Sequence, residues 1–220
     1  MRRIFNATRH GLRGLCTALA IVWMTSLSLQ LAKADEPVIL ALGDSLTAGY
    51  GLDAADSFPA QLERALAEAG TPAKVVNAGV SGDTSAGGRV RLDWLLADGA
   101  PDVLIVELGA NDGLRAIDPA STRGNLAAII ETGMEAGATV LLAGMYAPPN
   151  LGDEYTKAFN AAFLDLATQY GVIFYPFFLD GVAGDPSLNQ ADGIHPTPEG
   201  VAVIVENILP SVLQALGAER

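Results

Sequence analysis

Four short polar stretches of this chain carry the residue types that nucleophilic catalysis by serine requires. Ser45 lies in Gly-Asp-Ser-Leu, Gly82 in Ser-Gly-Asp-Thr-Ser, and Asn111 in Gly-Ala-Asn-Asp-Gly. Asp192 and His195 stand three residues apart in Asp-Gly-Ile-His-Pro. A serine nucleophile needs a general base, the base needs an acceptor that orients it, and the developing oxyanion needs fixed N–H donors. The chain supplies a candidate for each part.

One task can be assigned to each of these residues. Asp192 can accept a hydrogen bond from Nδ1 of His195, so that Nε2 faces Ser45. Gly82 has no side chain, so its backbone N–H can approach a substrate closely. The side-chain amide of Asn111 and the backbone N–H of Ser45 complete a set of three oxyanion donors. The predicted chemistry is acyl transfer through a covalent intermediate, with no metal and no cofactor.

The four stretches lie among apolar segments that alternate with longer amphipathic ones, a pattern typical of repeated βα units around a parallel sheet. The apolar segments are mostly rich in Val, Ile and Leu, as expected for strands covered on both faces. The predicted strands are Val38–Leu42, Lys74–Asn77, Val103–Leu108, Thr139–Ala143 and Val172–Tyr175. The predicted helices are Phe58–Ala69, a shorter one near Arg89–Leu96, Ser121–Ala136, Tyr155–Tyr170, and one from Pro198 to about Leu216. We expect Thr197 to cap the last helix and Pro210 to kink or break it.

The first three polar stretches follow the first three predicted strands. In an open parallel sheet of strand order 2-1-3-4-5, ligands bind beyond the carboxyl ends of the strands, between strands one and three. Ser45 and Asn111 then face each other, with Gly82 beside them. The predicted fold class is therefore α/β: a three-layer α/β/α arrangement around a flavodoxin-like, five-stranded parallel sheet.

The first 34 residues differ from the rest of the chain. Four arginines precede an apolar stretch from about Leu15 to Leu31, and Ala32-Lys33-Ala34 has the small-x-small pattern of a signal-peptidase site. The alternative is an uncleaved membrane anchor, but five polar residues dilute the apolar stretch, and a span needs about 20 predominantly apolar residues. We therefore predict a signal peptide over residues 1–34, a single domain over residues 35–220, and a periplasmic or secreted location without stable membrane insertion.

Removal of the predicted signal changes the composition. The segment holds five of the 13 basic residues and none of the 25 acidic ones, which leaves eight basic residues and a formal charge of −17. Such a surface repels phosphate backbones and anionic lipid headgroups, so nucleic acid is not an expected partner. Cys16 and His10 also leave with the segment, and His195 is then the only histidine. Disulfides, cysteine metal sites and multi-histidine metal sites are thereby excluded for the mature chain.

Each stretch also has an ordinary structural interpretation. Gly-Asp-Ser after a strand is commonly a turn or a helix N-cap, and Asp192 can make a local capping contact beside His195. The stretch around Asn111 can be an ordinary loop, and Gly82 can serve only a positive φ angle. The combination favours catalysis, because three such stretches at successive strand ends are joined by the only histidine of the mature chain.

At these residues the chain resembles the SGNH, or GDSL, hydrolase family, whose four blocks are named for Ser, Gly, Asn and His. The resemblance covers Pro37–Pro210, and the stretches "LGDSLTAGYG", "VVNAGVSGDTSAGG", "VELGANDGL" and "DGIHP" are most similar to the bacterial arylesterase and acyl-CoA thioesterase/lysophospholipase branch. Arg89-Val90-Arg91 departs from that branch without touching a matched position. The Gly-x-Ser-x-Gly elbow of the α/β-hydrolases is absent, because position 47 is Thr. The resemblance implies Ser45 as nucleophile, Gly82 and Asn111 as oxyanion donors, and Asp192 with His195 as the rest of the triad.

The resemblance also implies a function: an exported serine esterase that hydrolyses small-molecule carboxyl esters with aryl groups or short to medium acyl chains. Thioesters and lysophospholipids are further candidate substrates. The alternatives are a carbohydrate deacetylase of the same fold and an exported binding protein without turnover, since fold alone does not fix function. The residues expected to form the substrate pocket are Asp112, Leu114, Ile117, Tyr146 and Pro148.

Overall fold

The computed structural model of this protein describes residues 36–97 and 99–217, and the predicted signal peptide lies outside the described residues. The described chain is built around a sheet of parallel strands whose order is β2-β1-β3-β4-β5. This order confirms the predicted topology. The strands are β1 (Val38–Gly43), β2 (Lys74–Gly79), β3 (Val103–Glu107), β4 (Thr139–Ala143) and β5 (Ile173–Tyr175).

The register of the sheet brings the ends of three strands to the same level. Gly43, the last residue of β1, pairs with Gly79 at the end of β2 and with Glu107 at the end of β3. The segments that follow these three strands therefore leave the sheet from one edge. This edge positions the polar stretches that contain Ser45 and Asn111.

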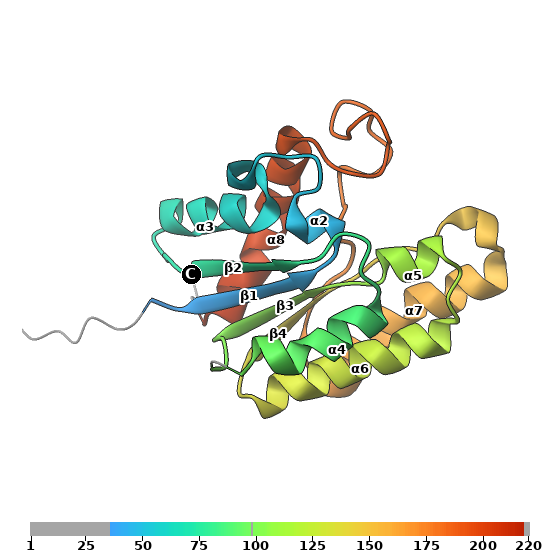
Figure 1. Ribbon diagram of the computed structural model, residues 1–220, viewed down its shortest axis with the longest axis horizontal. Helices are drawn as coiled ribbons and strands as arrows, with labels where there is room; N and C mark the ends of the chain where they lie inside the picture. Colours follow the sequence, from blue (N-terminus) through green and yellow to red (C-terminus); the bar gives the residue numbers. More distant parts are fainter. Residues whose placement is uncertain (1–35, 98, 218–220) are drawn as a thin grey trace, which may run out of the picture. The chain divides into compact units, whose positions relative to one another are not determined.

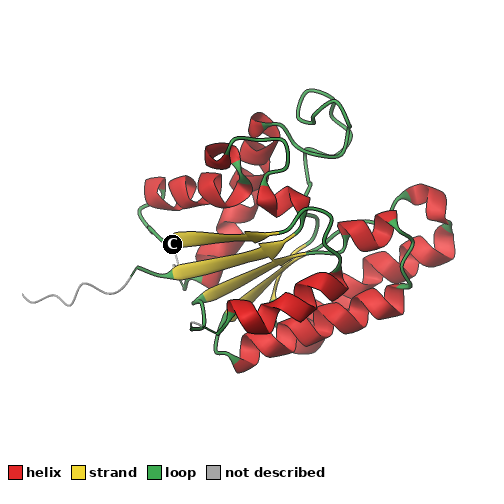
Figure 2. Cartoon of the chain, viewed as in Figure 1, coloured by secondary structure: helices red, strands yellow, loops and turns green. Residues whose placement is uncertain are grey.

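Helices cover both faces of the sheet (Figures 1 and 2). On one face α3 (Phe58–Glu68) packs against α8 (Pro198–Ala215), and on the other α6 (Pro119–Glu135) lies between α4 (Ser85–Leu95) and α7 (Asp153–Tyr170). All five residues of β3 are buried, which is why this strand is a continuous apolar run up to Glu107. The predicted three-layer arrangement is confirmed. None of the described helices combines the length and the apolar character that a membrane crossing requires.

Several short helices and one helix start differ from the sequence-based prediction. The unpredicted helices are α2 (Ser45–Ala48), η1 (Ala54–Asp56), α5 (Ala110–Leu114) and η2 (Pro149–Leu151). They are too short to show a hydrophobic period. Helix α4 begins at Ser85, four residues before the predicted start, because Thr84 caps it through Oγ1, which accepts from the backbone N–H of Gly87 at 3.4 Å. The other helix and strand boundaries agree with the prediction within two residues.

Of the two outcomes expected from the sequence at Pro210, a kink or a break, the break does not occur. Helix α8 is continuous from Pro198 to Ala215. Pro210 and Glu206, whose carbonyl loses its helical partner at the proline, are both exposed, so the missing hydrogen bond lies on the solvent side. Ile208 and Val212 on either side of the proline are buried and hold both parts of the helix on the core.

Candidate active site

Ser45, His195 and Asp192 form a continuous chain of hydrogen bonds. Ser45 is the first residue of α2, directly after β1, and His195 lies in the loop that precedes α8. Nε2 of His195 lies 3.0 Å from Oγ of Ser45, and Nδ1 lies 2.7 Å from Oδ2 of Asp192. The fold thus brings these three side chains together, although 150 positions separate Ser45 from His195.

The loop that carries Asp192 and His195 is braced by its own backbone. Oδ1 of Asp192 accepts hydrogen bonds from the backbone N–H of Ile194 at 3.0 Å and of His195 at 3.1 Å. Gly193 has a φ of +74°, a conformation that favours glycine. At the base of the loop the backbone N–H of Gln190 donates to the carbonyl of His195 at 2.7 Å. One short segment therefore holds both the carboxylate and the imidazole.

Hydrogen bonding lowers the pKa of Asp192 to about 2. The largest cause is the side-chain bond to His195, followed by the backbone N–H groups of Ile194 and His195. An ionised carboxylate can only accept hydrogen bonds, so Nδ1 of His195 donates to it, and in the neutral imidazole the lone pair of Nε2 faces the hydroxyl of Ser45. This is the tautomer that a general base for Ser45 requires.

Two residues that the sequence analysis did not single out hold His195 in place. The ring of Tyr50 lies against the imidazole, with ring centroids 4.6 Å apart. Nε2 of Gln190 donates to the carbonyl of Tyr50 at 2.8 Å and to that of Pro196 at 2.9 Å. Gln190 thereby connects the histidine loop to the segment that follows α2. Nothing in the spacing of these residues in the sequence indicates either contact.

The predicted oxyanion donors Ser45, Gly82 and Asn111 line the same cavity. Within the described chain, the backbone N–H groups of Ser45 and Gly82 have no hydrogen-bond acceptor. Gly82 has a φ of +82°, and its carbonyl accepts a hydrogen bond from Nη2 of Arg115 at 2.9 Å. Arg115 is the C-cap of α5, so it ties the loop of Gly82 to the helix that carries Asn111. These two N–H groups can therefore bind an anionic oxygen.

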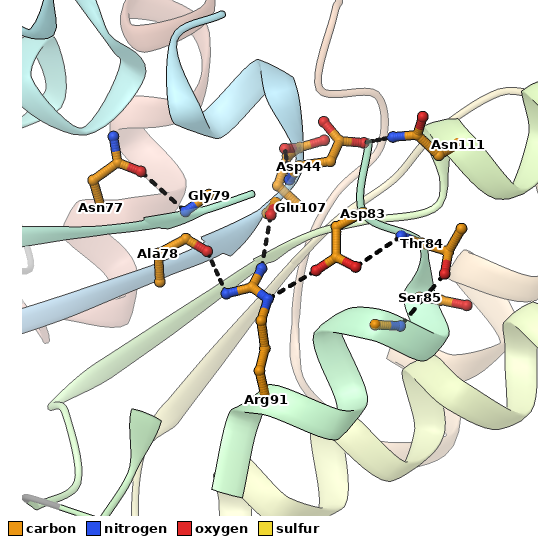
Figure 3. Close-up of polar contacts among 12 residues, drawn as sticks. Asp44, Asn77, Ala78, Gly79, Asp83, Thr84, Ser85, Arg91, Glu107 and Asn111 are labelled. Carbon is orange, nitrogen blue, oxygen red and sulfur yellow. Dashed lines mark hydrogen bonds and ion pairs between the residues drawn. The ribbon is translucent and has the colours of Figure 1, made fainter. Parts of the chain in front are cut away.

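Asn111 lies on α5 rather than in a loop, and its side-chain amide is held by Asp44. Nδ2 of Asn111 donates to Oδ2 of Asp44 at 2.9 Å (Figure 3). Asp44 is buried and is also the N-cap of α2, because its Oδ1 accepts from the backbone N–H of Leu46 at 3.0 Å. The residue that immediately precedes Ser45 thus connects the first and third polar stretches.

A second buried carboxyl, that of Glu107, lies beside Asp44 (Figure 3). Oε2 of Glu107 accepts from Oγ1 of Thr47 at 2.7 Å and from the backbone N–H of Asp44 at 3.3 Å, whereas Oε1 has no partner within the described chain. Burial raises the pKa of Asp44 to about 6. Burial, together with the charge of Asp44, raises the pKa of Glu107 well above its ordinary value. Because both oxygens of Asp44 have N–H donors, we place the negative charge of the pair on Asp44 and a proton on Glu107.

Arg91 of α4 fastens the ends of β1 and β2 together. Its Nη1 donates to the carbonyl of Ala78 at 2.6 Å and its Nη2 to the carbonyl of Gly43 at 2.9 Å. Its Nε bonds to Oδ2 of Asp83 at 2.8 Å (Figure 3). Arg91 belongs to the stretch that departs from the resembled branch, and it connects the two segments that carry Ser45 and Gly82.

Asp112 does not line the cavity, although the sequence analysis placed it in the substrate pocket. It is fully buried, and its carboxylate accepts from the backbone N–H of Ser85 at 2.8 Å and from Oγ1 of Thr122 at 3.0 Å. Successive residues of a helix point about 100° apart, so Asn111 lines the cavity while Asp112 bonds to α4 and α6. Asp112 therefore anchors α5.

A cavity of about 610 Å³ opens beside Ser45 and His195. Of the predicted pocket residues, Leu114, Tyr146 and Pro148 line it. Ile117 does not line it, since the residue lies in the turn after α5, where its carbonyl accepts from the hydroxyl of Tyr155 at 2.7 Å. The cavity wall is mostly apolar, so it suits an acyl or aryl group.

Three further lining residues were not predicted from the sequence. Met145 lies beyond the end of β4, and Phe177 and Leu179 lie beyond the end of β5. The ring of Phe177 stacks on that of Tyr146, with centroids 4.4 Å apart and an angle of 20° between the planes. An isolated apolar residue in a loop gives no sequence signal for such a contact.

Comparisons with curated proteins show which enzymes this chain is similar to. Esterase TesA of Pseudomonas aeruginosa is 42% identical over 195 residues, which cover 89% of this chain and 97% of that protein. An arylesterase of Vibrio mimicus is 38% identical over 188 residues, which cover 86% of this chain and 94% of that protein. The thioesterase 1/protease 1/lysophospholipase L1 of Escherichia coli is 38% identical over 188 residues, which cover 86% of this chain and 88% of that protein.

The similarity extends to three-dimensional structure and to a family profile. A crystal structure of TesA matches with a TM-score of 0.77 and 43% sequence identity, covering 81% of this chain and 99% of that one. The profile of the GDSL-like lipase/acylhydrolase family matches residues 41–203, which include Ser45, Gly82, Asn111, Asp192 and His195. The chain therefore belongs to the GDSL-like lipase/acylhydrolase family and is an SGNH hydrolase.

Proposed function

We propose that this hydrolase cleaves carboxyl esters through a covalent acyl-enzyme on Ser45. The observation that carries the proposal is the hydrogen-bonded chain from Oγ of Ser45 to Nε2 of His195, at 3.0 Å, and from Nδ1 to Asp192, at 2.7 Å. The nucleophile and the base lie within hydrogen-bond distance, and a third group orients the base. This is the arrangement that activates a serine hydroxyl.

In the first half of the reaction, Nε2 of His195 takes the hydroxyl proton while Oγ of Ser45 bonds to the ester carbonyl carbon. The carbonyl oxygen becomes an oxyanion, which accepts from the N–H groups of Ser45 and Gly82 and from Nδ2–H of Asn111. His195 then gives the proton to the leaving oxygen as the C–O bond breaks. In the second half, His195 removes a proton from water as the water oxygen bonds to the acyl carbon, and it then gives that proton to Oγ of Ser45 as the bond between Oγ and the acyl carbon breaks and the acid leaves.

The apolar wall of the cavity and the negative net charge of the chain support an uncharged or zwitterionic ester as substrate. The apolar side chains of Leu114, Tyr146 and Pro148 line the cavity and suit an aryl group or a short to medium acyl chain. The chain has a formal charge of −12, and of −17 without residues 1–34. This charge repels polyanionic molecules such as acyl-CoA and nucleic acids. Because relatives are named thioesterase and lysophospholipase, acyl-CoA and lysophospholipids are the substrates against which simple esters must be compared.

A chain-length series of p-nitrophenyl esters tests the proposal. We expect the wild type to hydrolyse these esters with a higher kcat/KM than acyl-CoA at physiological salt, and Ser45→Ala to lose several orders of magnitude in kcat. Ser187→Ala is the control, because Ser187 lies in an exposed turn where its hydroxyl bonds to Asp185. Wild-type turnover by Ser45→Ala, or higher kcat/KM for acyl-CoA, would contradict the respective part of the proposal.

Export is a further part of the proposal, and it rests on the arginines, the apolar stretch and Ala32-Lys33-Ala34 of the sequence. Amino-terminal sequencing of the protein from its own cells should begin at Asp35. Recovery of the chain with residues 1–34 intact in a membrane fraction would instead support the anchor.

A further inference from the structure

We propose that Asp44 is a positioning residue for catalysis: its carboxylate fixes the side-chain amide of Asn111 in the orientation that donates to the oxyanion. The inference rests on the proposed function, because it concerns an oxyanion donor of that reaction. It adds a residue outside both the triad and the three donors. The contact that motivates it is the hydrogen bond of 2.9 Å from Nδ2 of Asn111 to Oδ2 of Asp44 (Figure 3).

An asparagine amide can adopt two orientations of nearly the same shape, related by a 180° turn that exchanges its oxygen and nitrogen. With nitrogen toward Asp44, one N–H bonds to the carboxylate and the second N–H remains for the substrate. With oxygen toward an ionised Asp44, two acceptors face each other and repel. The carboxylate therefore selects the orientation in which Asn111 is a donor.

Both oxygens of Asp44 accept hydrogen bonds, so an amide at position 44 cannot replace the carboxylate. Oδ1 accepts from the backbone N–H of Leu46 at 3.0 Å, and Oδ2 accepts from Asn111. An asparagine at position 44 has one acceptor oxygen and must lose one of the two bonds. When its NH₂ group faces Asn111, the amide of Asn111 turns and presents an acceptor oxygen where the donor N–H stood.

Burial prevents water from replacing the missing interaction. Asp44 is 0% exposed, so a polar group that loses its partner there has no water to bond to and is left unpaired at a cost in free energy. Glu107, equally buried beside Asp44, bonds to Thr47 and to the backbone N–H of Asp44, and not to Asn111. The two neighbouring carboxyls therefore allow a matched comparison, because one of them contacts the oxyanion donor and the other does not.

A double-mutant cycle between Asp44→Asn and Asn111→Ala tests the inference. We expect Asp44→Asn to lower kcat about 10²–10³-fold, as the loss of one oxyanion donor does, with KM changed less than about threefold because the contact strengthens mainly in the transition state. Added to Asn111→Ala, Asp44→Asn should lower kcat no further, since both changes remove the same interaction. Glu107→Gln, whose amide oxygen can accept from Thr47 and from the backbone N–H of Asp44, should keep kcat within about threefold.

Asp44→Ser keeps the test valid if Asp44→Asn does not fold. Serine is a good N-cap residue and can still accept from the backbone N–H of Leu46, but its side chain is too short to reach Asn111. It should lower kcat in the wild type and have no further effect beside Asn111→Ala.

Losses that multiply in the double variants would overturn the inference, because Asp44 would then act independently of Asn111. An equal loss of kcat in Glu107→Gln would also overturn it, because kcat would then respond to any change in the buried carboxyls. Failure of the proposed function gives a different result: Ser45→Ala retains its activity whatever residue stands at position 44.

Discussion

The ring of Tyr50 lies against the imidazole of His195, with centroids 4.6 Å apart and the planes tilted by 37°. This contact connects the imidazole to the segment after α2. Substitution of Tyr50 therefore tests how much the position of the His195 imidazole contributes to kcat.

Tyr50→Ala should lower kcat about two- to tenfold, because an aromatic contact contributes about 0.5–1.5 kcal/mol and about 1.4 kcal/mol corresponds to a factor of ten. Tyr50→Phe keeps the ring and should retain wild-type kcat. Steady-state kinetics with p-nitrophenyl acetate measures all three proteins. An equal loss in Tyr50→Phe would assign the effect to the hydroxyl rather than to the ring.

His195→Ala should cost more than Asn111→Ala. Loss of the base removes proton transfer in both halves of the reaction, so kcat should fall by several orders of magnitude. Loss of the amide removes one of three oxyanion donors and should lower kcat about 10²–10³-fold, with KM little changed. Circular dichroism checks that both variants are folded. Near wild-type turnover by folded His195→Ala, or a rise in KM alone for Asn111→Ala, would exclude the assigned roles.

Gly79→Ala should lower both activity and stability. A Cβ at position 79 would lie 2.3 Å from the backbone nitrogen of Ala48, so α2 and Ser45 with it must move away from β2. Gly124→Ala is the matched control: a Cβ there meets nothing within 4 Å, and alanine stabilises an exposed helix position by about 0.5–1 kcal/mol relative to glycine. Urea unfolding and esterase kinetics measure both effects. Unchanged kcat in Gly79→Ala would show that α2 does not depend on this close contact.

The pH dependence of stability should differ between the wild type and Glu107→Gln. Burial raises the pKa of Glu107 well above its ordinary value, so in the folded protein it keeps a proton that the unfolded chain releases above about pH 4.5. The free energy of unfolding of the wild type should therefore fall relative to that of Glu107→Gln as the pH rises from about 4.5 toward the folded-state pKa. Urea titrations from pH 4 to pH 8 measure this difference. A difference that stays constant over this range would mean that Glu107 has the same pKa in the folded and unfolded states, and would contradict the prediction.

The strands of the sheet and the short polar motifs could be predicted from the sequence for physical reasons. Strands that helices cover on both faces are continuous apolar runs, so β1, β3 and β4 stand out from their surroundings. Parallel strands also bring their carboxyl ends to one edge of the sheet, so the sequence predicts that Ser45 and Asn111 lie close together. Asp192 and His195 lie in one loop, so their contact is local in sequence.

The remaining features depend on packing between distant segments. Tyr50 and Phe177 reach the cavity from loops, where no period or spacing marks them. Asp112 was predicted to line the pocket because it follows Asn111 in sequence. The turn of helix α5 instead directs its carboxylate to α4 and α6. The proximity of Asp44 to Glu107 arises from strand register, since Asp44 directly follows Gly43, which pairs with Glu107 at the end of β3.

Because one loop carries both Asp192 and His195, the triad depends on the relative position of only two chain segments, this loop and the segment of Ser45. The base of the loop is closed by the bond from Gln190 to the carbonyl of His195, and the side chain of Gln190 sets its position against Tyr50. When this loop moves, Nε2 of His195 leaves the hydroxyl of Ser45 while Nδ1 stays with the carboxylate. We therefore expect heating to release this one surface segment, and with it the activity, before the sheet unfolds, so that the midpoint of inactivation lies below the midpoint of global unfolding.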